Sequence, residues 1–288
     1  MKGLKLFCGV VVFSCASGAF ATDLSNSVTG SVSDGKSSIP YRLFEPQGLQ
    51  PGQKAPLVLF LHGMGDRGTD NVAQTEWMGG LVNNTKSGQY ASYVLAPQID
   101  TNSWFQSYTS QPTEAMKLTI SALKKVINTE NIDTSRIYVT GNSMGAMGTW
   151  DILAREPKLF AAAVPMSGGG DTRTARTIKD VPVWDFHGSA DTIVPVSASR
   201  DMIQALRDAG GNPKYTEVAG GGHVIWDPIY NDESHTLYPW LFSQHLSPST
   251  ISVDGNVATD VANTPEPGTI TCLTVAGMAL LGRRRRRA

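Results

Sequence analysis

Continuous apolar runs and helical apolar stripes alternate along the middle of this 288-residue chain. The runs at 56–61 and 93–96 are apolar throughout, which is typical of strands covered on both faces. After Pro112 the apolar residues recur every three or four positions, which predicts an amphipathic helix. Its stripe consists of Met116, Ile120, Leu123 and Ile127.

The rest of this region continues the alternation. An antiparallel start is expected at 27–33 and 41–45. Strands are then expected at 136–140, 160–165, 181–186 and 214–218, and helices at 144–155, 197–209 (closed by Gly210-Gly211) and 234–246. Such alternation predicts a mostly parallel, doubly wound sheet with helices on both faces. Sheets of this kind bind ligands at the carboxyl ends of their strands, so chemistry is expected there.

The stretch Gly141-Asn-Ser-Met-Gly145 has the form G-x-S-x-G at a strand-to-helix junction. A sharp turn would hold Ser143 with its hydroxyl out of the sheet and a helix N-terminus behind it. The flanking glycines would let neighbouring backbone pass close by. These features predict the nucleophile elbow of an α/β-hydrolase. A plain Gly/Ser loop is the alternative.

A serine nucleophile needs a base, and the base needs a carboxylate partner. In an α/β-hydrolase the acid and then the base follow the serine along the chain. Of the five histidines, His223 follows the last expected strand and a glycine-rich loop, which predicts the base. His235 and His245 are expected on the last helix, in surface or packing roles. Asp191, one loop earlier, is predicted to be the acid, with an ordinary turn aspartate as the alternative.

An oxyanion hole is the third requirement. One donor should be the backbone N–H of Met144, directly after the nucleophile. The second should come from the loop after the strand at 56–61, with Met64 N–H favoured and Gly63 N–H as the alternative. His62 is expected to be structural, hydrogen-bonded beneath this loop.

Three residues are candidates for the substrate pocket: Trp104, Trp226 and Gly169. For the two tryptophans, core packing is the equal alternative. The short connections leave little room for a cap domain. A shallow, open site suits an ester on a polymer better than a free lipid chain.

Residues 1–21 are typical of a secretory signal peptide. Lys2 and Lys5 precede an apolar core at 6–13, and Ala19-Phe-Ala21 provides a cleavage site. The mature chain is therefore expected to begin near Thr22. A lipoprotein signal using Cys15 is the weaker alternative.

The C-terminus has a different pattern. Residues 247–264 are small and polar, as in a linker. Pro265-Glu-Pro267 then precedes a largely apolar run at 268–282 and five arginines at 283–287. As a helix the run would be about 22 Å long, shorter than a bilayer core of about 30 Å. Residues 265–288 resemble a PEP-CTERM sorting tail of Gram-negative bacteria, which implies cleavage by an exosortase-type protease and delivery to the cell surface or outside. A simple membrane anchor is the alternative.

The two terminal segments hold seven of the 24 Lys and Arg and one of the 25 Asp and Glu, so the remaining chain has a net charge of −7. This charge argues against a nucleic-acid partner. All three cysteines, Cys8, Cys15 and Cys272, also lie in the terminal segments. The expected mature domain at 22–246 therefore has no disulfide and no thiol nucleophile.

Four motifs carry a family resemblance: residues 61–71, 141–150, 186–191 and 222–227. They resemble secreted α/β-hydrolase esterases, and are similar to carbohydrate esterase family 1, polyhydroxybutyrate depolymerase-like enzymes and predicted peptidases of prolyl-oligopeptidase type without a propeller. The resemblance covers about residues 40–246. It implies carboxylic-ester hydrolysis, commonly of feruloyl or acetyl esters on polysaccharides. Asn142 and Ala146 depart from the expected bulkier residue and glycine, which leaves the pocket shape open.

The leading hypothesis is therefore a secreted serine esterase that acts on short acyl, acetyl or feruloyl esters of polysaccharides or polyesters. It needs neither a metal nor an organic cofactor, and contacts a membrane only through its sorting tail. A serine peptidase is the second hypothesis, because the same triad cleaves amides. A non-catalytic surface-matrix protein with a hydrolase fold is the third.

Overall fold

A computed structural model describes residues 22–101, 111–232 and 234–246. The chain divides into two units, 1–252 and 253–288, and every described residue belongs to the first. The predicted signal peptide, linker and sorting tail, together with Trp104, lie outside the described residues.

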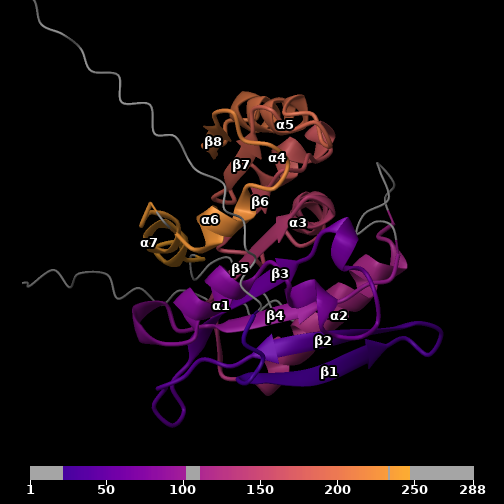
Figure 1. Ribbon diagram of the computed structural model, residues 1–288, viewed down its shortest axis with the longest axis vertical. Coiled ribbons are helices and arrows are strands. Elements are labelled where there is room, and N and C mark those ends of the chain that lie inside the picture. The colour runs from indigo at the N-terminus through magenta and orange to yellow at the C-terminus, as the bar shows by residue number, and fades with distance from the viewer. Residues whose placement is uncertain (1–21, 102–110, 233, 247–288) are drawn as a thin grey trace, which may run out of the picture. The chain divides into compact units, whose positions relative to one another are not determined.

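An eight-stranded sheet organises the fold, in the order β1-β2-β4-β3-β5-β6-β7-β8 (Figure 1). The strands are β1 (Ser27–Ser33), β2 (Ser38–Phe44), β3 (Ala55–Leu61), β4 (Tyr93–Pro97), β5 (Ile132–Asn142), β6 (Ala162–Met166), β7 (Trp184–Gly188) and β8 (Lys214–Val218). β2 pairs antiparallel with β1 and β4, and every pairing from β4 to β8 is parallel. The predicted antiparallel start and mostly parallel sheet are confirmed.

Helices cover both faces of this sheet. They are α1 (Gly79–Thr85), α2 (Glu114–Thr129), α3 (Met144–Arg155), α4 (Ala175–Ile178), α5 (Ser197–Asp208), α6 (Trp226–Tyr230) and α7 (Leu237–Phe242). One apolar cluster lies between the sheet and α2, α3, α4 and α5, and a second packs α1, α6 and α7 against the other face. Because side chains alternate along a strand, Leu57 and Leu59 enter the first cluster while Val58 and Phe60 enter the second. The chain therefore has the predicted α/β-hydrolase fold.

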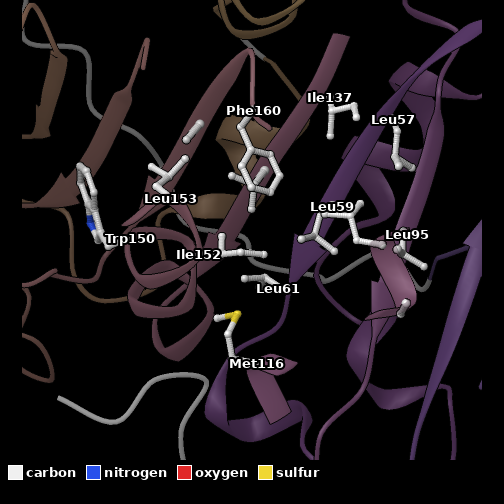
Figure 2. Packing of buried hydrophobic residues seen from close by; sticks show 14 of the residues in the cluster. Leu57, Leu59, Leu61, Leu95, Met116, Ile137, Trp150, Ile152, Leu153 and Phe160 are labelled. Atoms are coloured by element: carbon white, nitrogen blue, oxygen red, sulfur yellow. The ribbon is translucent and has the colours of Figure 1, made fainter. Parts of the chain in front are cut away.

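Local chemistry explains where the main helices begin and end. The Thr113 side chain accepts a hydrogen bond from Met116 N–H and caps α2. α5 ends at Asp208, and the chain then turns away at Gly210, whose φ of +88° suits glycine, while Gly211 N–H donates back to Leu206 O. Figure 2 shows Leu59, Leu61 and Ile152 among the side chains gathered in the first apolar cluster.

Some predicted boundaries were wrong. The strand expected at 181–186 occupies 184–188, since Pro182 has no N–H to donate to a sheet. The helix expected at 234–246 is the shorter α7, because Asp232 accepts hydrogen bonds from Thr236 and Leu237 N–H and starts the helix late. His235 and His245 consequently lie outside α7.

The structure also contains elements that the pattern did not predict, namely α1, α4 and α6. Each has seven residues or fewer, too short for a helical stripe to stand out. Among the described residues, no helix combines the length and the apolar character needed to cross a membrane.

Candidate active site

The turn between β5 and α3 holds Ser143 in a strained conformation, with φ +55° and ψ −117°. A non-glycine residue rarely adopts such a backbone, and it persists only where its surroundings enforce it. Here Ser143 N–H donates to Met166 O on the neighbouring strand at 2.8 Å. Ser143 O in turn accepts from Ala146 and Met147 N–H in the first turn of α3.

The two glycines of the motif make this turn possible through close approach. A Cβ atom on Gly145 would lie 1.8 Å from Leu61 O, and one on Gly141 would lie 2.5 Å from Gly145 O. Any side chain at either position would therefore push α3 away from β3 and β5. The elbow thus depends on both glycines, through the backbone contacts they permit.

Three loops at the carboxyl ends of β5, β7 and β8 bring Ser143, Asp191 and His223 together. His223 Nε2 lies 2.8 Å from Ser143 Oγ, and His223 Nδ1 lies 2.7 Å from Asp191 Oδ2. A carboxylate only accepts, so Nδ1 carries a proton and Nε2 can accept the serine proton. This hydroxyl–imidazole–carboxylate line has the geometry that nucleophilic catalysis by serine needs.

The Asp191 carboxylate is fixed on both of its oxygens. Its Oδ1 accepts hydrogen bonds from Ile193 and Val194 N–H at 2.8 and 2.9 Å, while Oδ2 faces His223. Burial alone would raise the pKa of Asp191, but the bonds from His223 and the two backbone amides outweigh it and lower the pKa. Asp191 is thus held as a carboxylate beside the imidazole.

The loop after β3 leaves one of the two candidate oxyanion donors available. Gly63 N–H already donates to Asp66 Oδ2 at 3.1 Å. Within the described residues, the N–H groups of Met64 and Met144 have no hydrogen-bond acceptor. Both follow the carboxyl end of a strand, β3 for Met64 and β5 for Met144. This arrangement favours Met64 over Gly63 as the second donor.

His62 anchors the same loop from below. It is fully buried, and its Nε2 accepts Ile99 N–H at 3.1 Å, so the proton sits on Nδ1 and is donated to Gly63 O at 2.7 Å. Burial lowers the pKa of His62 to about 4. Since Gly63 O and Met64 N–H belong to one peptide group, the bond to His62 also fixes the direction of Met64 N–H. His62 therefore has the hydrogen-bonded position beneath the loop that the sequence predicts.

A second titratable group, Asp66, braces this loop. Its side chain is buried, and burial raises the pKa of Asp66 to about 6, even though the hydrogen bond from Gly63 N–H favours the carboxylate. Glu76 adds to the rise through like-charge repulsion.

The predicted pocket residues have different surroundings. Trp226 is 4% exposed and belongs to the second apolar cluster, yet its ring meets His223 edge-on at 5.5 Å. It is thus a core aromatic that also contacts the imidazole. Gly169 packs against α5, where a Cβ would lie 2.7 Å from Ala198 Cβ. Trp104 lies outside the described residues.

Two further residues touch this site in ways that the sequence did not predict: Ser167, which was expected with Gly169 in the pocket-wall loop 167–170, and His187, which was expected only at the end of its strand. Ser167, at the end of β6 with φ +55°, donates from Oγ to His223 O at 2.9 Å. His187, at the end of β7, places Nε2 3.2 Å from Asp191 Oδ2. The one available signal was position: each lies at the carboxyl end of a strand, and His187 precedes Asp191 by four residues.

Two hollows lie at the opposite, amino ends of the strands. One, of about 540 Å³, is lined by residues that include Lys54 and Arg136, and the other, of about 430 Å³, by residues that include Lys179 and Trp240. Neither is lined by a residue of the serine, histidine and aspartate cluster.

Comparisons with known proteins agree with this arrangement. A sequence model of the phospholipase/carboxylesterase family matches residues 50–241. A solved structure, described as a thermostable esterase, is 37% identical with a TM-score of 0.70, and the match covers 77% of this chain and 64% of that one.

Two named proteins show a more distant similarity. The bifunctional acetylxylan esterase/xylanase XynS20E of Neocallimastix patriciarum is 26% identical, over 69% of this chain and 27% of its own length. Poly(3-hydroxyalkanoate) depolymerase C of Paucimonas lemoignei is 33% identical, over 40% of this chain and 28% of its own length. The chain thus spans only about a quarter of either protein.

Proposed function

Because this chain belongs to the phospholipase/carboxylesterase family, we propose that it is a serine carboxylic-ester hydrolase with Ser143, His223 and Asp191 as its catalytic triad. One observation carries the proposal: His223 bridges the Ser143 hydroxyl and the Asp191 carboxylate through bonds of 2.8 and 2.7 Å. The strained backbone of Ser143 adds support, since such strain gathers at functional sites.

The reaction follows from this geometry. Ser143 Oγ attacks the ester carbonyl while His223 Nε2 takes its proton, and Asp191 stabilises the resulting imidazolium. The N–H groups of Met64 and Met144 donate to the oxyanion of the tetrahedral intermediate. His223 then protonates the leaving alcohol, and water releases the acyl group by the same steps.

The proposed substrates are short acyl, acetyl or feruloyl esters carried by polysaccharides or polyesters. The described relatives include an acetylxylan esterase and a polyhydroxyalkanoate depolymerase, which supports this class. Met64 and Val224, in the loops that carry the oxyanion donor and the base, are 49% and 50% exposed. Their apolar side chains provide contact area for an acyl or aromatic group.

The proposed reaction is tested by comparing the rate at which the protein hydrolyses an ester, p-nitrophenyl acetate, with the rate at which it hydrolyses an amide, an aminoacyl-anilide. Wild type is expected to cleave the ester, and Ser143→Ala to lose turnover while keeping its thermal unfolding curve. Faster cleavage of the anilide would favour the peptidase alternative, and cleavage of neither would favour the non-catalytic one. Acetyl-xylan, methyl ferulate and hydroxybutyrate oligomers then rank the substrates.

We also propose export through a cleaved signal peptide, followed by removal of the C-terminal tail by an exosortase-type protease. The sequence patterns at 1–21 and 265–288 support this, and a secreted protein of Arthroderma benhamiae is 24% identical over 74% of this chain. Intact-mass measurement of the exported protein tests it. A chain that begins at Thr22 and lacks the arginine cluster is expected, whereas a full-length product would contradict both cleavages.

A further inference from the structure

The acid of the proposed triad has a second imidazole beside it. His187 is fully buried at the end of β7, and its Nε2 lies 3.2 Å from Asp191 Oδ2 and 3.0 Å from Val194 O. Its other ring nitrogen, Nδ1, lies 2.7 Å from Ser199 Oγ on α5. The mechanism above gives this side chain no role.

The partners of His187 determine where its proton lies. Val194 O can only accept, so Nε2 carries hydrogen and donates to it. This holds whether Nδ1 accepts from Ser199 or donates to it. Asp191 Oδ2 lies 3.2 Å from the same nitrogen, beside this hydrogen bond. That oxygen receives His223 Nδ1–H at 2.7 Å. One carboxylate oxygen therefore accepts a hydrogen bond from His223 and lies beside the N–H of a second imidazole, His187.

We propose that His187 is a positioning residue for the triad acid. Its ring holds Val194, whose N–H binds Asp191 Oδ1, and its Nε2–H dipole, 3.2 Å from Asp191 Oδ2, offsets part of the negative charge that would otherwise act on His223. The inference rests on the proposed function. It assigns His187 no contact with substrate, only an effect through Asp191.

Other charged groups around His187 are already satisfied or neutral. Glu217, its register partner on β8, is bound by Arg200 at 2.6 and 2.8 Å. Asp185 lies on the same face of β7, fully buried, and burial raises its pKa well above the usual range, which disfavours its charged form. Within the described residues, Asp191 is thus the carboxylate that His187 contacts.

The role predicts a direction of change in pH dependence. Without the His187 N–H, more of the Asp191 charge acts on His223, so the protonated imidazole is stabilised and releases its proton at higher pH. The acid-side inflection of kcat/KM should move upward, and kcat/KM should fall because the carboxylate is less firmly oriented.

Two substitutions separate this role from plain packing. His187→Asn places an amide near the Nδ1 position and loses the N–H that binds Val194 O beside Asp191, whereas His187→Gln can place an N–H near the Nε2 position. His187→Asn should lower kcat/KM roughly tenfold and raise the acid-side inflection by about half a pH unit. His187→Gln should restore most of the rate and return the inflection toward that of wild type. Ser199→Ala, which leaves the Asp191 contact in place, is the control.

The decisive experiment combines these profiles with thermal unfolding curves and a ring-nitrogen NMR titration of His223 in each variant. An upward shift with His187→Asn that His187→Gln reverses supports the proposal. Equal loss of stability in both variants, with an unchanged His223 titration, would overturn it. Because the NMR titration needs no substrate, it tests His187 even if wild type proves inactive on every ester, which would overturn the proposed function instead.

Discussion

The loop after β3 and the loop after β8 each present an imidazole at the carboxyl edge of the sheet, but with different partners. His62 is bonded to two backbone groups, Gly63 O and Ile99 N–H, and is fully buried. His223 is bonded to two side chains, the Asp191 carboxylate and the Ser143 hydroxyl, and its side chain is 16% exposed. Both rings use both nitrogens.

The difference in partners explains why we propose His223, and not His62, as the catalytic base. Burial and the hydrogen bond from Ile99 N–H hold His62 neutral, with a pKa of about 4. His62 therefore holds the loop after β3 in place. His223 has a carboxylate that stabilises its charged form and a hydroxyl that can give up a proton. In the proposed mechanism, one region therefore contributes rigidity and the other contributes proton transfer.

Substituting the two histidines gives the sharpest contrast. His223→Ala should lower kcat/KM by about 10⁴-fold or more and leave the unfolding temperature near that of wild type. His62→Ala should instead lower the free energy of unfolding by about 2–3 kcal/mol, because Ile99 N–H and Gly63 O lose a buried partner. Ester hydrolysis and thermal unfolding measure the two effects. A stable but inactive His62→Ala together with an active His223→Ala would contradict the assignment of His223 as the base and His62 as the structural residue.

The proposed oxyanion donor, Met64 N–H, can be removed in a way that separates its effect from that of the Met64 side chain. Met64 is the first residue of a 3₁₀ turn, after an extended Gly63, so proline fits there and deletes only the N–H. Met64→Pro should lower kcat about 100- to 1000-fold with little change in KM. Met64→Ala, which keeps the N–H, is the matched control. Equal rates for the two variants would exclude Met64 N–H as a donor.

Asp66 should make stability depend on pH. Its pKa rises from 3.8 to about 6 on folding, so the folded state binds the proton more tightly and loses stability as pH rises through this window. Asp66→Asn keeps an acceptor for Gly63 N–H and removes the titration. Relative to wild type it should gain about 2–3 kcal/mol in free energy of unfolding between pH 4 and 7. Denaturant titrations at each pH measure this, and a constant difference would contradict it.

The smallest expected effect concerns Ser167, whose hydroxyl fixes the His223 backbone through a bond of 2.9 Å to His223 O. Ser167→Ala should lower kcat/KM less than about tenfold, since a neutral hydrogen bond contributes about 1 kcal/mol. Steady-state kinetics with p-nitrophenyl acetate measure this. A loss as large as that of His223→Ala would mean that Ser167 does more than position the base.

Sequence reasoning was most successful where local pattern and chain order suffice. The extent of α3 followed from the motif and the helical residues behind it, and the apolar runs located β3 and β4. The order serine, acid, base selected Asp191 and His223, which the structure places in contact with each other. Their catalytic roles remain a prediction until they are tested.

The remaining features depend on contacts between distant segments. His187 meets Asp191 only because the loop after β7 folds back, and the Asp66 side chain is held inside the loop after β3 by the hydrogen bond from Gly63 N–H. The late start of α7 depends on the Asp232 carboxylate, which no helical periodicity reveals. Side-chain bonds within a loop leave no repeating pattern in a sequence, so such features need coordinates.

The most direct test of the central claim is intact-mass and peptide mapping of the folded protein after treatment with a fluorophosphonate probe. The account predicts one adduct per chain, on Ser143, that is absent in Ser143→Ala and forms far more slowly in His223→Ala. Folded wild type that stays unlabelled, or that carries its adduct on another residue, would contradict it.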